Sequence, residues 1–158
     1  MGSSLIIERT YDKKIIGDVV SDSLNDLLQD GETEGDCYFD VERDCYLALY
    51  DDNLIGVYQL RPINRTVIDL HPIMLRKHRD RSNESIKEVF KWIVDNCAKT
   101  VNKVIAQFPS NRIHIEKFAL RAGFKKEGIN RESFLLNGKY LDQTMVGITM
   151  NEIKEALL

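Results

Sequence analysis

The sequence has few cysteines, no excess of positive charge and no long hydrophobic run. Its three cysteines, Cys37, Cys45 and Cys97, are odd in number and lack metal-ligand spacing, so we expect reduced thiols, a cytoplasmic location and no metal site. The formal net charge of −3 argues against nucleic acid as a partner. No apolar segment approaches the roughly 20 residues of a membrane span, and the opening MGSSLI lacks the pattern of a secretory signal. We therefore expect no membrane and no nucleic-acid partner.

The sequence also lacks repeats, low-complexity tracts and linkers. Its 158 residues are 43% hydrophobic and 30% charged, which is typical of a globular chain with a sizeable core. This composition predicts a single domain over residues 1–158.

Hydrophobic spacing predicts a chain that alternates strands with helices. Apolar residues every three or four positions indicate helices, and alternation indicates strands. Asp12 is expected to cap the first helix, Gly31 to end it, and Asn137-Gly138 to form a hairpin turn. The predicted strands are residues 5–11, 45–50, 54–60, 66–75, 101–109, and two strands between residues 124 and 150. The predicted helices lie between Asp12 and Gly31, at residues 83–96, between Asn111 and Gly123, and at residues 151–158.

The most informative stretch combines a strand at residues 66–75, a basic turn and the helix at residues 83–96. Ser82 or Asn83 is expected to cap this helix. A helix start has unpaired N–H groups and a partial positive charge, so it suits a phosphate, and cations before it strengthen the site. The cations of the turn are Arg76, Lys77, His78, Arg79 and Arg81. The stretch predicts a phosphate site, and the alternative is a solvated basic loop that binds nothing.

The predicted order is strand, helix, three antiparallel strands, helix, strand, helix and two strands. With this order, the segments NRIHIEKFALRAGFKKEGI and LLNGKYLDQ resemble the GNAT superfamily of N-acetyltransferases. The closest local resemblance is to the ending of the ribosomal-protein N-terminal acetyltransferases, and a looser one is to phage-encoded GNAT-like proteins. The resemblance implies an α+β fold in which helices flank a mixed, mostly antiparallel sheet of about seven strands.

The resemblance implies acetyl-CoA as co-substrate, in a gap between the fourth and fifth strands. Family members hold its diphosphate on a loop of pattern Arg/Gln-x-x-Gly-x-Gly/Ala, where glycines let backbone N–H groups approach the phosphates. Here Arg79 takes the leading position, but Ser82 and Glu84 replace the two small residues. The alternative is that Glu84 repels the diphosphate and the site is lost. The cofactor-binding residues that the resemblance implies are Ile73, Met74, Leu75, Arg76, Arg79, Arg81, Ser82, Asn83 and Asn111.

The predicted catalytic residues are His71, Asp69, Ser110 and Asn111. His71 and Asp69 are two apart on a strand, so they share a face, and the carboxylate can orient the imidazole as a base for the amine. The alternative is an ordinary surface contact. Ser110 and Asn111 follow the fifth strand and can bond the thioester, or they can cap the next helix.

Members of the family often have a tyrosine in the helix after the fifth strand that acts as the general acid. This chain has Phe118 and Ala119 there instead. Tyr140 does not match that spacing. A further acidic segment, Asp36 to Asp44, suits either a cationic acceptor or solvent.

Two functions remain open from the sequence. The first is acetyl transfer from acetyl-CoA to a primary amine, either of a small molecule or of a protein N-terminus. The alternative is a non-catalytic protein with the GNAT fold that serves in binding or in phage virion assembly. Such a protein has lost the glycine-rich CoA loop and the tyrosine that acts as the general acid. The expected macromolecular partner is a second copy of the chain or a phage protein.

Overall fold

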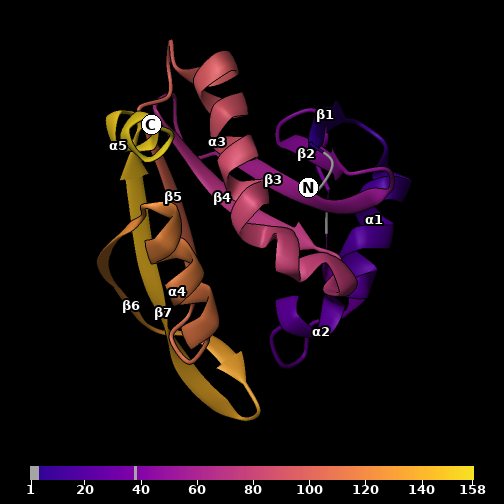
Figure 1. Cartoon of the computed structure of the whole chain (residues 1–158). Coiled ribbons are helices and arrows are strands. Elements are labelled where there is room, and N and C mark those ends of the chain that lie inside the picture. Colours follow the sequence, from indigo (N-terminus) through magenta and orange to yellow (C-terminus); the bar gives the residue numbers. More distant parts are fainter. Residues whose placement is uncertain (1–3, 38) are drawn as a thin grey trace.

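The computed structural model describes residues 4–37 and 39–158, so the first three residues of the MGSSLI segment lie outside it. Its centre is a seven-stranded sheet with strand order β1-β2-β3-β4-β5-β7-β6 (Figure 1). The strands are β1 Ile6–Thr10, β2 Cys45–Tyr50, β3 Leu54–Pro62, β4 Val67–Met74, β5 Lys103–Pro109, β6 Lys125–Leu136 and β7 Lys139–Thr149. The order, pairing and flanking helices confirm the predicted GNAT-like fold class.

The sheet divides between β4 and β5, which form its parallel pair. Their register joins Val67–Asp69 only to Lys103–Ile105, so the two strands separate after Asp69. Every other neighbouring pair is antiparallel and extends over more residues. The separation divides the molecule into a β1–β4 half and a β5–β7 half, and Figure 1 shows the latter diverging from β4.

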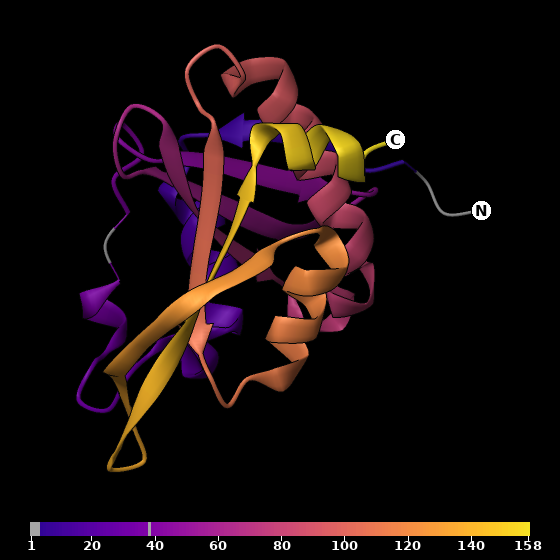
Figure 2. The same ribbon diagram turned by 90° about the vertical axis from the view of Figure 1, so that its left-hand side faces the viewer.

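Helices cover both faces of the sheet. The helices are α1 Lys13–Asp22, α2 Leu24–Leu27, α3 Ser82–Cys97, α4 Ile113–Ala122 and α5 Met150–Ala156, with short 3₁₀ helices η1 Glu34–Asp36 and η2 Arg76–Arg81. The apolar stripe of α3 packs with α4, α5 and one sheet face in the larger core, whereas α1 covers a smaller cluster on the opposite face (Figure 2). No described helix is long and apolar enough to cross a membrane.

Several local predictions are confirmed. The Asp12 carboxylate accepts a hydrogen bond from the Lys14 backbone N–H at 2.9 Å and caps α1. Gly123 ends α4 with φ +111°, and Asn137 and Gly138 form the β6–β7 turn, both with positive φ. The helix cap, the helix end and the hairpin turn each depend on the effect of a residue on the nearby backbone, so the local sequence was sufficient to predict them.

Two predictions about helix boundaries are wrong. The first helix does not run to Gly31 but breaks at Ser23, whose buried hydroxyl donates to the Met74 carbonyl at 3.3 Å. The basic turn is the 3₁₀ helix η2, which runs directly into α3, so neither Ser82 nor Asn83 caps α3. The residue before α3 is Arg81, and the Ser82 N–H already bonds to the Arg79 carbonyl.

A buried hydroxyl pair fixes the start of α3 against β3. The Ser85 hydroxyl donates to the Ser82 carbonyl at 2.7 Å, so the Tyr58 hydroxyl, 2.7 Å from Ser85 Oγ, must be the donor in that contact. Both residues are fully buried. Burial raises the pKa of Tyr58, which keeps its phenol protonated.

This direction of donation predicts unequal mutational costs. Ser85→Ala leaves the buried Tyr58 O–H without an acceptor and should lower the free energy of unfolding by about 2 kcal/mol. Tyr58→Phe leaves the Ser85–Ser82 bond intact and should cost about 1 kcal/mol. Urea unfolding measures both values, and a larger loss for Tyr58→Phe would contradict the assignment.

Candidate functional site

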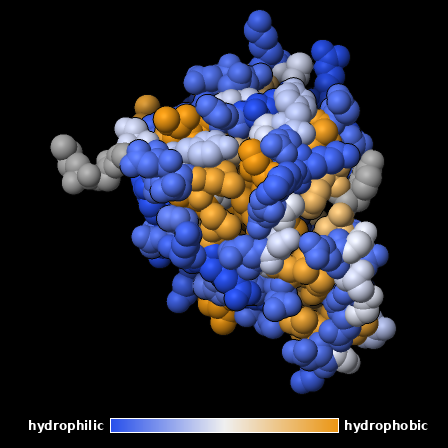
Figure 3. Space-filling model, turned by 90° about the vertical axis from the view of Figure 1, so that its right-hand side faces the viewer, coloured by the Kyte–Doolittle hydropathy of each residue, from blue (hydrophilic) through white to orange (hydrophobic). Residues whose placement is uncertain are grey.

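The separation of β4 from β5 opens a cleft of about 620 Å³. Its walls come from Leu70–Met74 of β4, Ala106–Pro109 of β5, the start of α3 and one side of α4. The walls are mostly apolar, and the charged residues among them include Asp26, Arg79 and Arg112. Figure 3, which faces the side bearing α1, shows apolar patches separated by hydrophilic groups.

The predicted Asp69–His71 contact forms on β4, at the point where β5 diverges. His71 Nε2 lies 3.1 Å from Asp69 Oδ2, and His71 lines the cleft. The imidazole is 43% exposed and the carboxylate 19%, so the ring is accessible to a substrate while the acid beneath it is shielded. Because the carboxylate can only accept a hydrogen bond, Nε2–H is the donor, and Nδ1 of the neutral ring carries the lone pair.

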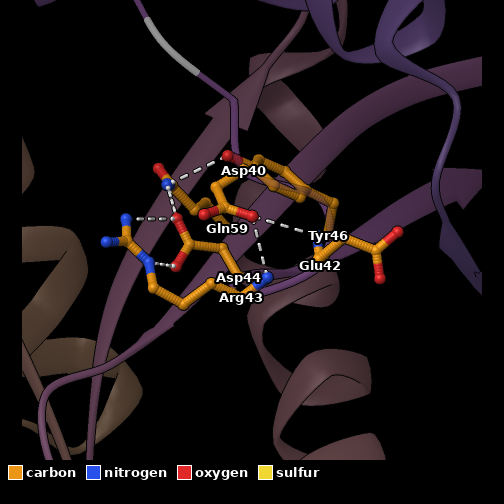
Figure 4. A network of polar contacts seen from close by, with 6 residues as sticks. All are labelled: Asp40, Glu42, Arg43, Asp44, Tyr46 and Gln59. Atoms are coloured by element: carbon orange, nitrogen blue, oxygen red, sulfur yellow. Dashed lines mark hydrogen bonds and ion pairs between the residues drawn. The ribbon is translucent and has the colours of Figure 1, made fainter.

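A polar network lies beside this pair and was not predicted. In the strand register Tyr46 faces Gln59, and Gln59 faces His71. The Gln59 amide donates to Tyr46 Oη at 3.1 Å and to the buried Asp44 carboxylate at 2.9 Å (Figure 4). Burial and the charge of Asp44 raise the pKa of Tyr46 to about 12, so its hydroxyl is protonated at neutral pH.

Three acidic residues before β2, Asp36, Asp40 and Asp44, have structural partners. Asp44 also pairs with Arg43 at 3.0 Å, and Asp40 accepts hydrogen bonds from the backbone N–H groups of Glu42 and Arg43 (Figure 4). The Asp36 carboxylate bonds to the Thr33 backbone. These three carboxylates therefore bond to neighbouring protein groups.

At the start of α3, Glu84 does not block the cleft. Its carboxylate accepts two hydrogen bonds from the Arg81 guanidinium, at 2.7 and 2.9 Å, and it is not among the residues that line the cleft. Arg81 also pairs with Asp51 at 3.0 Å. The carboxylate that the sequence placed against a diphosphate is thus paired with Arg81 outside the cleft.

One carboxylate at the cleft opening collects three arginines. Asp26 Oδ2 lies 2.8 Å from Arg79 Nη2 and 3.8 Å from Arg76 Nη2, and Asp26 Oδ1 lies 3.7 Å from Arg112 Nη1. The hydrogen bond from Arg79 lowers the pKa of Asp26, and the charges of all three arginines contribute. Asp26, Arg79 and Arg112 line the cleft.

Asp26 belongs to a segment, residues 22–30, that crosses the opening and is here called the strap. On the β4 side, Asp22 accepts from the Arg76 N–H at 2.7 Å. On the other side, Asp30 accepts from the backbone N–H groups of Asn137 and Gly138 at 3.0 and 2.8 Å. Gln29 accepts from the Leu135 N–H at 2.8 Å. The strap therefore connects the two halves of the molecule over the cleft.

Comparisons with known proteins place the chain in a family. A family model described as "Protein of unknown function (DUF2824)" matches residues 18–158. The chain belongs to the DUF2824 family. No curated protein sequence matches it.

Solved structures show which fold this DUF2824 protein has. Mutant forms of the spermidine/spermine N-acetyltransferase SpeG from Vibrio cholerae superpose with a TM-score of 0.77 at 15% identity, over 96% of this chain and 97% of that one. Spermidine N-acetyltransferase from Vibrio cholerae in complex with CoA and spermine gives 0.77 at 16% identity, over 96% and 98%. The DUF2824 protein therefore has the GNAT fold. The finer resemblances to ribosomal-protein acetyltransferases and phage proteins gain no support.

The structure brings together only some of the predicted site residues of the DUF2824 protein. The predicted residues that line the cleft are His71, Ile73, Met74, Arg79, Ser82 and Asn83. Those that do not line it are Asp69, Leu75, Arg76, Arg81, Ser110 and Asn111. Asp69 and Arg76 contact lining residues, His71 and Asp26 respectively.

Ser110 and Asn111 do not cap α4, so that alternative is wrong. The Arg112 N–H bonds to the Pro109 carbonyl at 3.0 Å, which places Ser110 and Asn111 in a turn, and the residue before α4 is Arg112. The Ser110 hydroxyl lies 3.0 Å from Thr144 Oγ1 on β7. Their predicted catalytic role remains a prediction.

Among the described residues, no tyrosine lines the cleft of the DUF2824 protein. Phe118 does, as the departure from the family pattern suggested, whereas Tyr140 is 66% exposed elsewhere. Nothing in the sequence indicated Asp26 or Arg112 as residues of the site. No local pattern marks either residue, because the two meet only through a contact between distant segments.

Proposed function

We propose that this protein is an acetyl-CoA-dependent N-acetyltransferase that transfers an acetyl group to a primary amine of a small molecule. The observation that carries the proposal is the cleft between β4 and β5, which has an Asp69–His71 pair on one wall and arginines at its opening. A CoA complex of a protein with the same fold supports it. The non-catalytic alternative has no comparable support.

Acetyl-CoA would supply the acetyl group as a thioester. The amine nitrogen would attack the thioester carbonyl carbon to form a C–N bond, and the C–S bond would break to release the CoA thiolate. His71 Nδ1 would accept the proton that the amine loses, and Asp69 would orient the ring and stabilise its charged form. Gln59 and Tyr46 hold the neighbouring sheet face in place. Water in the open cleft is the expected proton source for the departing thiolate.

The acceptor that we favour is a polyamine-like small molecule rather than a protein N-terminus. Two fold neighbours are named as spermidine or spermidine/spermine N-acetyltransferases. The cytoplasmic location predicted from the cysteines remains a prediction, and the three thiols are free.

The proposal predicts that CoA stabilises the folded protein. A ligand that binds only the folded state raises the melting temperature, so CoA at 100 times its Kd should add about 2.7 kcal/mol to the free energy of unfolding. Thermal denaturation with and without CoA measures the shift. Acetyl-CoA with spermidine should then release free thiol, measured against the constant background of the protein's own cysteines.

Two controls separate the outcomes. An acetyl-CoA reaction without amine gives the rate of simple hydrolysis, and a peptide with a free N-terminus tests the other acceptor class. Absence of any melting shift with CoA would contradict the proposal and leave the binding or assembly alternative. Thiol release with the peptide but not with spermidine would contradict only the acceptor.

A further inference from the structure

The three arginines around Asp26 come from separate parts of the fold. Arg76 and Arg79 lie on η2, after β4, whereas Arg112 precedes α4, after β5. Asp26 comes from α2 on the strap. The cluster therefore spans both walls of the cleft.

The cluster has more positive than negative charge. Asp26 is the carboxylate that pairs with all three guanidinium groups, and Asp22 contributes a second carboxylate through the Arg76 backbone N–H. Only Arg79 is within hydrogen-bond distance of Asp26, while the other two arginines lie 3.7 and 3.8 Å away. Three guanidinium groups thus converge on the Asp26 carboxylate, which accepts a hydrogen bond from only one of them, Arg79.

We propose that Asp26 is a built-in placeholder: it holds Arg76, Arg79 and Arg112 together before the donor binds, and a phosphoryl group of the donor displaces it from them. The proposal rests on the function proposed above and adds Asp26 and Arg112 to its donor-binding residues. The ligand class is a phosphate or diphosphate, and the source that the cleft favours is the CoA moiety of the donor.

Phosphoryl chemistry fits this arrangement better than carboxylate chemistry does. Guanidinium groups bind phosphate oxygens in a forked geometry, and a diphosphate offers more oxygens and more charge than one carboxylate. The Arg112 side chain is only 19% exposed, so its charge is partly shielded from solvent. Arg76 and Arg79 are about half exposed, so the affinity should weaken as salt is added.

The test compares Asp26→Asn with the unmodified protein, using inorganic pyrophosphate and CoA as separate probes in calorimetry. Removing the competing carboxylate should tighten pyrophosphate and CoA about tenfold. Pantetheine, which carries no phosphate, should bind both proteins equally. The matched control is Asp30→Asn, which removes the same charge and loosens the same strap without uncovering the arginines, and it should leave pyrophosphate affinity unchanged.

A second variant tests the arginine that the sequence did not indicate. In the Asp26→Asn background, Arg112→Gln should abolish most of the gain in pyrophosphate affinity. Equal tightening by Asp30→Asn and Asp26→Asn would overturn the proposal, because net charge or strap release would then explain the gain. An Asp26→Asn protein with unchanged pyrophosphate affinity and a raised KM for the amine would also overturn it, and would assign Asp26 to the acceptor.

These outcomes are separable from a failure of the proposed function. If Asp26→Asn tightens CoA but no amine is acetylated, the subsite stands and the transferase proposal fails. If amines are acetylated and Asp26→Asn binds pyrophosphate no more tightly, the transferase stands and the placeholder proposal fails.

Discussion

Replacement of His71 by alanine should lower the kcat of acetyl transfer about a hundredfold or more and leave the Kd for CoA nearly unchanged. The expected loss is large because His71 is the imidazole on β4 that both lines the cleft and contacts a shielded carboxylate, Asp69. Steady-state kinetics at saturating acetyl-CoA measure kcat, and calorimetry measures the Kd.

The pH dependence of the rate distinguishes a base from a structural residue. The deficit of the His71→Ala protein should narrow as pH rises toward the amine's own pKa of about 10, where solvent removes the proton without help. Asp69→Asn should give a smaller loss, because the ring stays in place but its charged form is less stabilised. A His71→Ala protein with an unaltered kcat would remove His71 from the mechanism.

A methyl group at Gly56 should destabilise the protein by about 3 kcal/mol, at the upper end of the cost of overpacking. A Cβ built on Gly56 of β3 lies 2.7 Å from Met74 Sδ and 2.9 Å from the Ile73 carbonyl oxygen. The Met74 side chain can move, but the carbonyl belongs to the β4 backbone and cannot. Urea unfolding of Gly56→Ala measures the loss.

Gly17→Ala is the matched control for this substitution. Gly17 lies within α1, and a Cβ there meets nothing within 4 Å. Alanine should therefore raise the free energy of unfolding by up to about 1 kcal/mol through helix propensity. A Gly56→Ala protein as stable as the unmodified one would show that β3 and β4 do not approach as closely as the structure indicates.

The consequence of Gly56 extends to the site. Ile73 and Met74 line the cleft at the end of β4, so a shift in that strand changes the wall against which a thioester arm would lie. We expect Gly56→Ala to weaken CoA in calorimetry even at temperatures where the protein remains folded.

The sequence was most informative where a structure depends on neighbouring residues. The strand at Cys45–Tyr50 was predicted with its observed bounds, and the Asp69–His71 contact follows from the alternation of side chains along β4. The GNAT-like order of elements was also predicted, because each element carries its own hydrophobic period.

The basic turn before α3 was harder to predict. The sequence indicated basic residues before a helix, but not that residues 76–81 would form η2 and occupy the Ser82 N–H. It also indicated a repulsive Glu84, whereas the structure pairs that carboxylate with Arg81 away from the cleft. The direction of a side chain at a helix start depends on the segments that surround it, so the spacing of charges in the sequence does not predict it.

By itself, the sequence determined the α+β order, the helix and strand periods, the hairpin turns and the placement of one histidine beside one aspartate. Only the tertiary structure decided that the strap crosses the cleft and that Asp26 meets arginines from both walls. Asp26 and Arg79 are 53 residues apart, and Asp30 and Gly138 are 108 apart. Such contacts form because the separated β4 and β5 halves bring distant segments to one opening, and no local propensity encodes that convergence.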